Sequence, residues 1–457
     1  MNNVIIMAAG KGSRMKTALP KCAVPILGKP MILYLIDMLQ NFSFDKTICV
    51  VGHQKQILID LLKERVRFVE QPTPLGTGDA IIRAMPFIKS TGFTIIMSGD
   101  TPLISADIIK NLIHKHLEEK NDLTITTTFL RNPFGYGRII RNRMNEPIDI
   151  LEEKEANEIQ KATREINVGL YCIQNESLLK HIFNLKPHST EEYYITDIVG
   201  MLSKTGKVGA YTVEDSYHIK GINDLNSLAS VEDELRKHII MKHILNGVHI
   251  CQPNTITIGE DVQIEAGTTI HSGSILLGNC FIGKDCVIGP NTELLNTTTE
   301  ESIVCKQSVV FDSYIGHHTT IGPFAHLRSN CKIGPYNRIG NFVELKNTNT
   351  KEHTKIAHLA YLGDTVCGAR VNWGCGSITV NYNGKEKNKT IVEDDVFIGC
   401  NSNLIAPITL QKGSYIAAGS TITENLDEGD FAIARVKQLT KKNYAQKYYK
   451  GQATKKI

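Results

Sequence analysis

Short apolar runs alternate with longer amphipathic segments over about the first 222 residues. Strands covered on both faces read as continuous aliphatic segments, whereas surface helices repeat their apolar positions every three or four residues. Buried strands are predicted for four runs: Val4–Met7, Ile48–Val51, Ile95–Met97 and Leu123–Thr128. Helices are predicted between the first of them, over Pro30–Gln40 and Gln54–Lys63. Strands that alternate with helices predict an α/β domain over residues 1–222 with a Rossmann-like, mostly parallel sheet.

A single helix is predicted to link this domain to the rest of the chain. Asn223 and Asp224 offer capping side chains, and Asn246 with Gly247 offers a stop. Between them apolar residues recur at three- and four-residue steps: Leu225, Leu228, Val231, Leu235 and Ile239. We therefore assign residues 223–247 to a helical linker.

The hydrophobic period then changes to six. One run comprises Ile258, Ile264, Ile270, Leu276, Ile282, Ile288 and Leu294. Three inserted residues then reset the phase. The second run comprises Ile303, Val309, Ile315, Ile321, Leu327, Ile333, Ile339 and Leu345. The third run comprises Val392, Ile398, Leu404, Leu410, Ile416 and Ile422. A parallel β-helix repeats at six, with one inward aliphatic residue on each of three short faces per turn. The pattern predicts a solenoid over residues 248–436, with a lapse of the repeat between about 346 and 391.

Composition narrows the classes of protein that fit. The 457 residues are 42% hydrophobic with a net charge of +4, which fits two or three folded domains and does not indicate nucleic-acid binding. Residues 437–457 form a tail with seven lysines and no acidic residue. No segment approaches the roughly 18 apolar residues of a membrane span, so we expect no membrane association.

The cysteines and the N-terminus indicate a cytoplasmic location. Met1–Met7 lacks a basic segment before its apolar run, which is typical of a first strand and not of a signal peptide. The eleven cysteines contain no CxxC pair, so we expect reduced thiols and no metal cluster built on them.

A small-residue turn directly follows the first predicted strand. Its sequence is Ala8-Ala9-Gly10-Lys11-Gly12-Ser13-Arg14-Met15, with Lys21 a few residues further on. It is neither a GxxxxGK[ST] phosphate loop nor the GxGxxG dinucleotide motif. Small residues let backbone N–H groups approach a phosphate, and Arg14 and Lys21 can neutralise a triphosphate.

This segment resembles the signature of sugar-1-phosphate nucleotidylyltransferases. Together with the solenoid, residues 4 to about 436 resemble the bacterial bifunctional enzymes of UDP-N-acetylglucosamine synthesis, which join an N-acetylglucosamine-1-phosphate uridyltransferase to a glucosamine-1-phosphate acetyltransferase. Further matching segments are Leu75–Gly78, Ser98–Leu103, Gly135–Ile139, Glu165–Asn167, Glu192–Asp197, Gly221–Asn223 and Ala357–Asp364. The resemblance implies that the β-helix is left-handed and that the chain forms a homotrimer.

In the first domain the resemblance implies uridylyl transfer from UTP to N-acetylglucosamine 1-phosphate. Asp100, at a strand end where α/β ligands gather, would bind Mg²⁺ with Asn223. Arg14 and Lys21 would be catalytic, stabilising charge as pyrophosphate leaves. Uracil would be read by Gln71, Gly76 and Thr77, and the sugar held by Gly137, Glu152 and Asn167. The other residues expected to bind substrate are Ala8, Ala9, Gly10, Ser98 and Gly99.

In the solenoid the resemblance implies acetyl transfer from acetyl-CoA to glucosamine 1-phosphate. His358 would be the general base, since amine acylation needs a proton acceptor near neutral pH, and direct attack on the thioester is expected. The acceptor site would comprise Arg328, Lys346, Tyr361, Asn372 and Lys387. Acetyl-CoA would contact Cys375, Asn381, Tyr382, Cys400, Ala418 and Arg435.

Two of these positions carry cysteine where the family commonly has other small residues. Cys375 and Cys400 can preserve backbone contacts to coenzyme A, and a thiol there can also make the site sensitive to oxidation or alkylation. The basic tail is a candidate clamp over coenzyme A phosphates.

Two alternatives to the bifunctional enzyme stay open at this point. One is a nucleotidylyltransferase whose β-helix only regulates or oligomerises, and the other is a non-catalytic scaffold of the same two folds. Lys346, His358 and Lys387 argue against the first, and Asp100 with Asn223 against the second.

Overall fold

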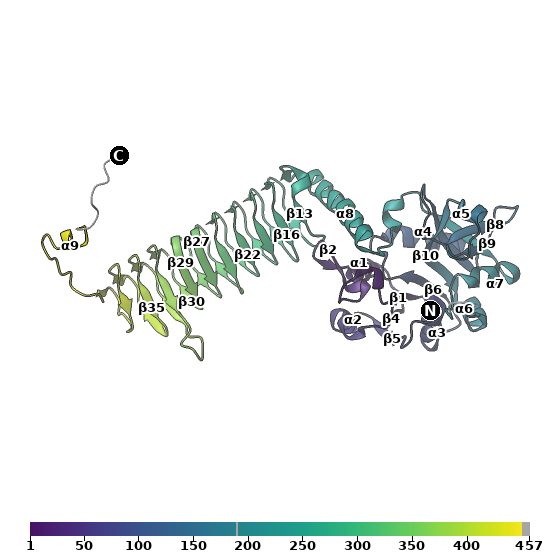
Figure 1. Ribbon diagram of the computed structural model, residues 1–457, viewed down its shortest axis with the longest axis horizontal. Helices are drawn as coiled ribbons and strands as arrows, with labels where there is room; N and C mark the ends of the chain where they lie inside the picture. The colour runs from purple at the N-terminus through teal and green to yellow at the C-terminus, as the bar shows by residue number, and fades with distance from the viewer. Residues whose placement is uncertain (189–190, 450–457) are drawn as a thin grey trace. The chain divides into compact units, whose positions relative to one another are not determined.

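The computed structural model describes residues 1–188 and 191–449, which form two compact units. The first spans Met1–His238 and the second begins at Ile239. Helix α8 (Leu225–Leu245) runs across this boundary in the chain (Figure 1). Of the predicted basic tail, residues 450–457 lie outside the described residues.

A twisted, mostly parallel sheet forms the centre of the first unit. Its strands follow the order β11-β7-β10-β6-β1-β4-β5, and only β10 runs antiparallel to its neighbours along this path. These strands are β1 (Asn3–Ala8), β4 (Lys46–Val51), β5 (Arg67–Glu70), β6 (Phe93–Ser98), β7 (Leu123–Phe129), β10 (Glu165–Gln174) and β11 (Val208–Thr212). Hairpin β8 (Arg138–Arg141)–β9 (Pro147–Leu151) pairs with β10, and β2 (Pro25–Ile26) pairs with β3 (Lys29–Pro30). The four strands predicted from apolar runs are confirmed.

Helices cover both faces of this sheet, as the alternation of strands and helices predicts. Strand β1 sends Val4 and Ile6 into one fully buried cluster and Ile5 into the other. The first cluster packs under α1 (Met31–Leu39), α2 (Lys55–Leu62) and α4 (Ala106–Glu118), and the second under α3 (Gly76–Ala84), α6 (Asn175–His181) and α7 (Asp197–Thr205). Shorter helices are α5 (Glu158–Lys161), η1 (Ser13–Met15), η2 (Lys21–Ala23), η3 (Lys63–Arg65), η4 (Met85–Phe87), η5 (Ile182–Asn184) and η6 (Ser216–Ile219).

The second unit is a parallel β-helix of stacked three-sided coils (Figure 1). The first face contains β14 (Gln263–Ile264), β17 (Phe281–Ile282), β20 (Thr298–Thr299), β23 (Tyr314–Ile315), β26 (Lys332–Ile333), β28 (Asn349–Thr350), β30 (Thr365–Cys367), β33 (Thr390–Val392) and β36 (Ile408–Leu410). The second contains β12 (His249–Ile250), β15 (Thr269–Ile270), β18 (Val287–Ile288), β21 (Val304–Cys305), β24 (Thr320–Ile321), β31 (Asn372–Trp373), β34 (Phe397–Ile398), β37 (Tyr415–Ile416) and β39 (Phe431–Ala432). The third contains β13 (Thr257–Ile258), β16 (Ile275–Leu277), β19 (Glu293–Leu295), β22 (Val309–Phe311), β25 (His326–Arg328), β32 (Ile378–Val380), β35 (Asn403–Ile405) and β38 (Thr421–Ile422).

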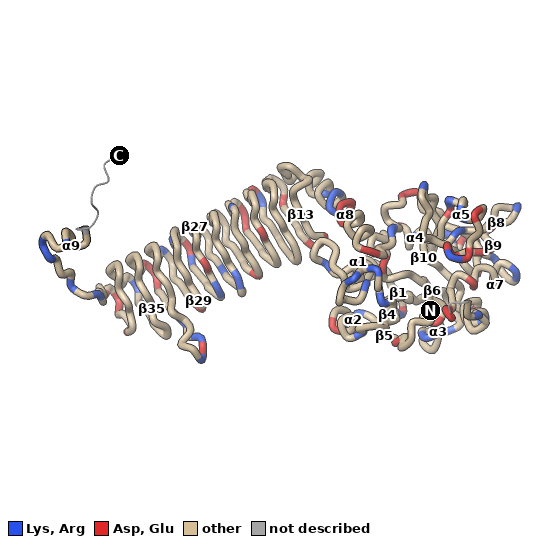
Figure 2. Tube along the Cα trace, viewed as in Figure 1, with Lys and Arg blue, Asp and Glu red and all other residues tan. Residues whose placement is uncertain are grey.

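Two long strands join the second face to the third without a break. They are β27 (Arg338–Lys346) and β29 (Lys355–Gly363), which pair in parallel register along their length. The remaining short helices of this unit are η7 (Pro253–Thr255) and α9 (Gln446–Tyr449). Between the last coil and α9, Lys437, Lys441 and Lys442 are exposed, and the described part of the tail carries no acidic residue (Figure 2).

Each face contributes two inward positions to the solenoid core. One position holds an aliphatic residue, and the other, two residues earlier, holds a small residue, such as Thr268 before Ile270. The Thr268 hydroxyl donates to the Gly283 carbonyl at 2.7 Å, so the buried polar group is satisfied within the coil. Cys280, Cys286 and Cys331 occupy the same small position, and Cys305 and Cys367 occupy the aliphatic position, so five of the eight cysteines in this half belong to the core of the coils.

The predicted phase between the first two runs is wrong. Inward residues there are Thr299, Cys305 and Val310, which are buried at 2%, 2% and 0% exposure and pair in register with the preceding coil. The chain advances five residues from 294 to 299, from 305 to 310 and from 310 to 315, so the coils are shortened and no three residues are inserted. Ile303 is buried at the small position, whereas Val309 is only half-buried.

The predicted lapse of the repeat between 346 and 391 is also largely wrong. Coils continue through this region with inward residues that a search for aliphatic side chains misses, among them Cys367 and Trp373. Trp373, the one tryptophan of the chain, is 3% exposed and its Nε1–H donates to the Cys367 sulfur at 3.4 Å. The real interruption is a loop over 381–389, where Cys367 and its coil partner Val392 are 25 residues apart.

No helix among the described residues is both long enough and apolar enough to cross a bilayer.

The corrected register predicts that aspartate substitutions at two neighbouring valines differ sharply in their effect on the free energy of unfolding. Val310→Asp puts an unpaired carboxylate into the core and should lower the free energy of unfolding of the β-helix by about 3 kcal/mol or more. Val309→Asp is the matched control and should cost much less, because its side chain is half-buried outside the core. Denaturant unfolding followed by circular dichroism measures both. A larger loss for Val309→Asp would contradict this register.

Candidate functional site

A cavity of about 520 Å³ opens at the carboxyl ends of β1 and β6. Parallel strands end at the same edge of a sheet, so the turn after β1 and the turn after β6 converge there. The predicted residues that line it are Ala8, Ala9, Gly10, Arg14, Lys21, Gln71, Gly76, Thr77, Ser98 and Asp100. Lys11, Cys22, Pro74, Glu192 and Tyr194 also line it and were not predicted as site residues.

The Lys21 ammonium lies between the two predicted metal ligands. It makes a short ion pair with the Asp100 carboxylate and donates to Asn223 Oδ1 at 2.8 Å. Arg14 Nη2 also donates to Asn223 Oδ1, at 3.0 Å. Two oxygens, from Asp100 and Asn223, thus meet two cationic groups, from Lys21 and Arg14, although the residues lie up to 209 positions apart in the chain. Such an arrangement can hold a cation and polyphosphate oxygens together.

Local backbone structure fixes both sides of this arrangement. Asp224 caps helix α8 by accepting the Ser227 N–H at 2.8 Å, and the Asn223 N–H donates to the Ser227 hydroxyl at 2.9 Å. The Asn223 side chain is therefore oriented by the start of the helix. Gly12 has φ +60°, and a Cβ there would lie 2.7 Å from Lys21 Cβ, so glycine allows the turn to approach Lys21.

The predicted base-reading residues form a separate wall of the cavity. Gln71 Nε2 donates to the Gly76 carbonyl at 3.0 Å and to Asp79 Oδ2 at 2.9 Å. The Thr77 hydroxyl accepts the Ile195 N–H at 3.0 Å, which joins helix α3 to the segment before α7. Gly99 does not line the cavity; it packs over Cys22, whose Sγ would lie 2.8 Å from an added Cβ.

Gly137, just before β8, Glu152, just after β9, and Asn167, on β10, form a second group. The Asn167 N–H donates to the Gly137 carbonyl at 2.9 Å, and the Asn167 amide donates to the Tyr171 hydroxyl at 2.7 Å. Burial raises the pKa of Glu152, while its hydrogen bond from the Thr196 hydroxyl at 3.3 Å opposes that rise. These three residues do not line the cavity of about 520 Å³.

His188 joins two segments beside this group, and the sequence alone did not identify it. Its Nδ1 lies 2.6 Å from Glu155 Oε1 and its Nε2 lies 2.8 Å from Asp197 Oδ2. Because both ring nitrogens face carboxylates, both donate only when the imidazole is protonated. The hydrogen bond to Asp197, aided by that to Glu155, raises the pKa of His188 above its ordinary value.

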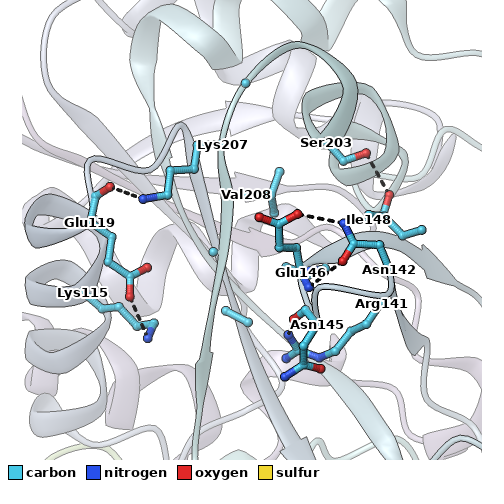
Figure 3. Close-up of a pocket in the computed structure, with 14 residues that line it drawn as sticks. Lys115, Glu119, Arg141, Asn142, Asn145, Glu146, Ile148, Ser203, Lys207 and Val208 are labelled. Atoms are coloured by element: carbon cyan, nitrogen blue, oxygen red, sulfur yellow. Dashed lines mark hydrogen bonds and ion pairs between the residues drawn. The ribbon is translucent and has the colours of Figure 1, made fainter.

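A second cavity of about 530 Å³ lies between β11, the β8–β9 hairpin and the end of α4 (Figure 3). Its polar side chains are largely engaged by neighbours: Lys115 pairs with Glu119 at 3.0 Å, the Asn142 amide donates to Glu146 at 2.8 Å, and Arg141 pairs with Glu165 at 2.6 Å. None of the predicted site residues is among its described lining residues. We therefore assign no chemistry to it.

In the second unit, five residues occupy the same corner of five successive coils. They are Asn341, His358, Cys375, Cys400 and Ala418, and we call this set the corner column. Each precedes a residue with positive φ: Phe342, Leu359, Gly376, Asn401 and Gly419. His358 is exposed, and its Nδ1 lies 2.8 Å from Asn341 Oδ1. An amide oxygen only accepts, so Nδ1 carries the proton and Nε2 keeps a free lone pair.

Some of the other acetyl-site predictions form a polar cluster on the neighbouring face. An added Cβ at Gly363 would lie 2.5 Å from both Tyr361 Oη and Asn381 Nδ2, so these two side chains meet over that glycine. Asn381 Nδ2 also donates to Asp364 Oδ2 at 2.6 Å. Tyr382 lies in the exposed loop, where its hydroxyl donates to the Gly384 carbonyl at 2.8 Å.

Two lysines converge beside this cluster. Contact with the Lys387 ammonium lowers the pKa of Lys346, although the residues are 41 positions apart. Arg328 lies beside Lys346 in register and donates two bonds to Glu344 Oε1, at 2.9 and 2.6 Å. Paired cations of this kind stabilise an anion placed between them.

Two predicted residues lie apart from this cluster in the single chain. Asn372 belongs to the face before the corner column, where it pairs with Lys355 and Phe397. Arg435 Nη1 donates to the Ala418 carbonyl at 2.8 Å, which places it at the end of the corner column. Asn341, which the sequence did not indicate, is distinguished only by its position one coil before His358.

Comparisons with known proteins also find one kind of domain in the first unit and another in the second. Residues 4–166 match the MobA-like NTP transferase domain, residues 312–347 match the bacterial transferase hexapeptide and residues 389–424 match the hexapeptide repeat of succinyl-transferase. The bifunctional protein GlmU of Acholeplasma laidlawii is 44% identical over 447 residues, 97% of both chains. Those of Brevibacillus brevis and a Geobacillus strain are 42% and 41% identical over 97% of both chains.

The fold and its two sites define a two-domain transferase, an α/β nucleotidyltransferase joined to a left-handed β-helix acyltransferase. The chain belongs to the GlmU family of bifunctional proteins. It is a bifunctional enzyme of UDP-N-acetylglucosamine synthesis, which confirms the prediction of paired uridyltransferase and acetyltransferase activities over the two alternatives.

The contacts of His188 predict a pH-dependent stabilisation of the first unit. Since its pKa in the folded state is raised, the contribution is complete below the ordinary value of 6.5, while the carboxylates are ionised, and is lost as the pH rises through the raised value. The difference in Tm between the wild type and His188→Gln should therefore shrink as the pH rises above neutrality. Calorimetry across this range measures it, and a difference that grows with pH would contradict the assignment.

Proposed function

We propose that uridylyl transfer takes place in the cavity at the ends of β1 and β6. The observation that carries this proposal is the Lys21 ammonium held between Asp100 and Asn223, next to the Ala8–Gly10 turn. Backbone N–H groups of the turn can bind the phosphates of UTP. Arg14 and Lys21 then offset the charge that develops on the α-phosphate and on the leaving pyrophosphate.

The donor set of this site fits Mg²⁺. Asp100 offers a carboxylate and Asn223 an amide oxygen, which are hard ligands, and Mg²⁺ commonly takes one or two protein ligands and completes its shell with water and phosphate. A cationic group already lies between these two oxygens. When bound, the ion would supply further neutralisation of the phosphates, and Lys21 would exchange its bonds to Asp100 and Asn223 for bonds to phosphate oxygens.

Recognition of the base falls to the Gln71 wall of the cavity, and recognition of the sugar falls to the second group, formed by Gly137, Glu152 and Asn167. The Gln71 amide N–H groups are engaged by Gly76 and Asp79, which leaves its oxygen to accept the N3–H of uracil. Glu152 and Asn167 can bind sugar hydroxyls, with Gly137 leaving room beside them. N-acetylglucosamine 1-phosphate then attacks the α-phosphorus of UTP in line.

Acetyl transfer is assigned to the solenoid, with His358 as the base. The Asn341 bond leaves Nε2 able to take a proton from the amine of glucosamine 1-phosphate as it attacks the thioester of acetyl-CoA. Arg328, Lys346 and Lys387 would bind the phosphate of the acceptor, and Tyr361 its sugar. The coenzyme would lie along the column from Cys375 to Arg435, with Asn381 and Tyr382 at the acyl end.

The separation of Asn372 from the cluster supports a homotrimer. Asn372 is on another face of the same chain, so a neighbouring copy could supply it to a shared acceptor site. The partners are then small molecules and two further copies of the chain, without nucleic acid or membrane. A cytoplasmic location suits enzymes that use UTP and acetyl-CoA.

The two sites should fail independently. Asp100→Ala should lower uridylyl transfer by about 100-fold or more, because it removes the carboxylate proposed to hold Mg²⁺ against the phosphates, and should leave acetyl transfer unchanged. His358→Ala should lower acetyl transfer by roughly 10²–10⁴-fold and spare uridylyl transfer. Separate assays, one with UTP, N-acetylglucosamine 1-phosphate and Mg²⁺ and one with acetyl-CoA and glucosamine 1-phosphate, measure each. Loss of both activities in either variant would refute the assignment.

Asn341 is predicted to be a positioning residue for His358. Asn341→Ala should lower kcat for acetyl transfer by about tenfold or more with little change in KM, since the imidazole loses its fixed tautomer. Asn341→Asp should move the acid limb of the pH–rate profile to higher pH, because a carboxylate favours the imidazolium. An unshifted profile with an equal loss of activity in both variants would indicate a purely structural role.

A further inference from the structure

The corner column brings two cysteines into direct succession. Trp373 pairs with Ile398 in adjacent parallel strands, so Cys375 and Cys400, two residues further along each strand, occupy equivalent positions. The Asn401 N–H donates to the Cys375 carbonyl at 2.8 Å, and Gly374 and Gly399 pack backbone to backbone. Neighbouring strands are ~4.8 Å apart. That separation lies within the Cα–Cα range of about 4.4–6.8 Å that a disulfide spans.

These two thiols differ from the other nine in being accessible. All eleven cysteines lie within the described residues; eight are buried, Cys251 is half-buried, and Cys375 and Cys400 are exposed. Burial raises the pKa of Cys22 and of Cys367 to about 12, so these thiols remain protonated and unreactive at neutral pH. Both residues flanking the pair in the column lack a thiol: His358 precedes it and Ala418 follows it.

We propose that Cys375 and Cys400 form a redox-active thiol pair that takes low-molecular-weight disulfides as its oxidant. One thiolate attacks a sulfur of the disulfide RSSR, which forms a mixed disulfide and releases RS⁻. The second cysteine thiolate then attacks the protein sulfur of that mixed disulfide and releases the other RS⁻. The two thiol protons go to the two released thiolates, so two cysteines are oxidised and one disulfide is reduced to two thiols.

Oxidation has a consequence for the acetyl site, and this part rests on the proposed function. The pair lies between His358 and Ala418 on the path assigned to coenzyme A. A bond between the two sulfur atoms turns both side chains along the column and away from the outward direction in which they would meet the coenzyme. Acetyl transfer then falls in oxidised protein, while uridylyl transfer in the other unit continues.

The test treats the fully reduced chain with oxidised glutathione, caps remaining thiols with N-ethylmaleimide under denaturing conditions and maps the peptides by mass. The expected product has lost two hydrogen atoms and contains Cys375 linked to Cys400. Cys251→Ser is the matched control and should form the same link. Cys375→Ala and Cys400→Ser should each retain a glutathione adduct on the remaining cysteine, because no resolving thiol is left.

Three outcomes in the wild type would overturn the proposed thiol pair. They are persistent glutathione adducts on both cysteines, maleimide on both, or a link from either to another cysteine. Each protein's acetyl transfer is then compared with that of its own reduced form. Activity should fall in proportion to the linked fraction in the wild type and return with dithiothreitol. A linked protein with undiminished acetyl transfer would overturn the regulatory part. A reduced chain without any acetyl transfer would instead count against the proposed function, and the mass measurement would still decide the thiol pair.

Discussion

The backbone ladder between successive coils of the β-helix is the constraint on which its chemistry depends. Each coil donates N–H groups to the next, as from Gly374 to Ile398 and from Gly399 to Ile416, at 2.8 and 2.9 Å. Because the ladder is parallel and in register, residues one coil apart in sequence stand side by side in space. The Asn341 amide oxygen therefore lies beside His358, 17 residues later in the chain, and can accept its hydrogen bond. In the same way the thiols of Cys375 and Cys400, 25 residues apart, become neighbours. Side chains are placed by the rigid scaffold and need few contacts of their own.

The first unit brings its functional side chains together in a different way. Its sheet brings strand ends together at one edge, and loops from β1 and β6 supply the groups that surround the phosphate site. Lys21 reaches this edge from the short helix η2, where Gly12 leaves space for it, and Asn223 reaches it from the residue before the cap of α8, where its N–H donates to the Ser227 hydroxyl. The three functions proposed for this cavity, which are to bind phosphate, a metal ion and a base, are thus divided among segments that each have an independent structural reason to lie where they do.

Much of this could be predicted from the sequence, and the failures have physical causes. Aliphatic runs located four of the nine strands in the main sheet of the first unit, since burial on both faces demands them. The shortened coils at Thr299 and Val310 were missed because a solenoid interior accepts threonine and cysteine as readily as isoleucine when their polar atoms bond within the coil. Asn341 and His188 were missed because their roles come only from what stands opposite them: one amide oxygen facing an imidazole, and one imidazole facing two carboxylates. Single-residue chemistry cannot reveal such pairs.

Trp373 gives the solenoid an intrinsic optical label. It is the one tryptophan of the chain, it is 3% exposed inside the β-helix, and its indole touches the Cys367 sulfur. Tryptophan emission from the intact protein therefore originates wholly in the second unit, next to the coils that carry His358 and the thiol pair. Water entering this part of the core changes the emission, whatever happens to the nucleotide-binding half, so unfolding of the second unit can be followed by itself without an added label.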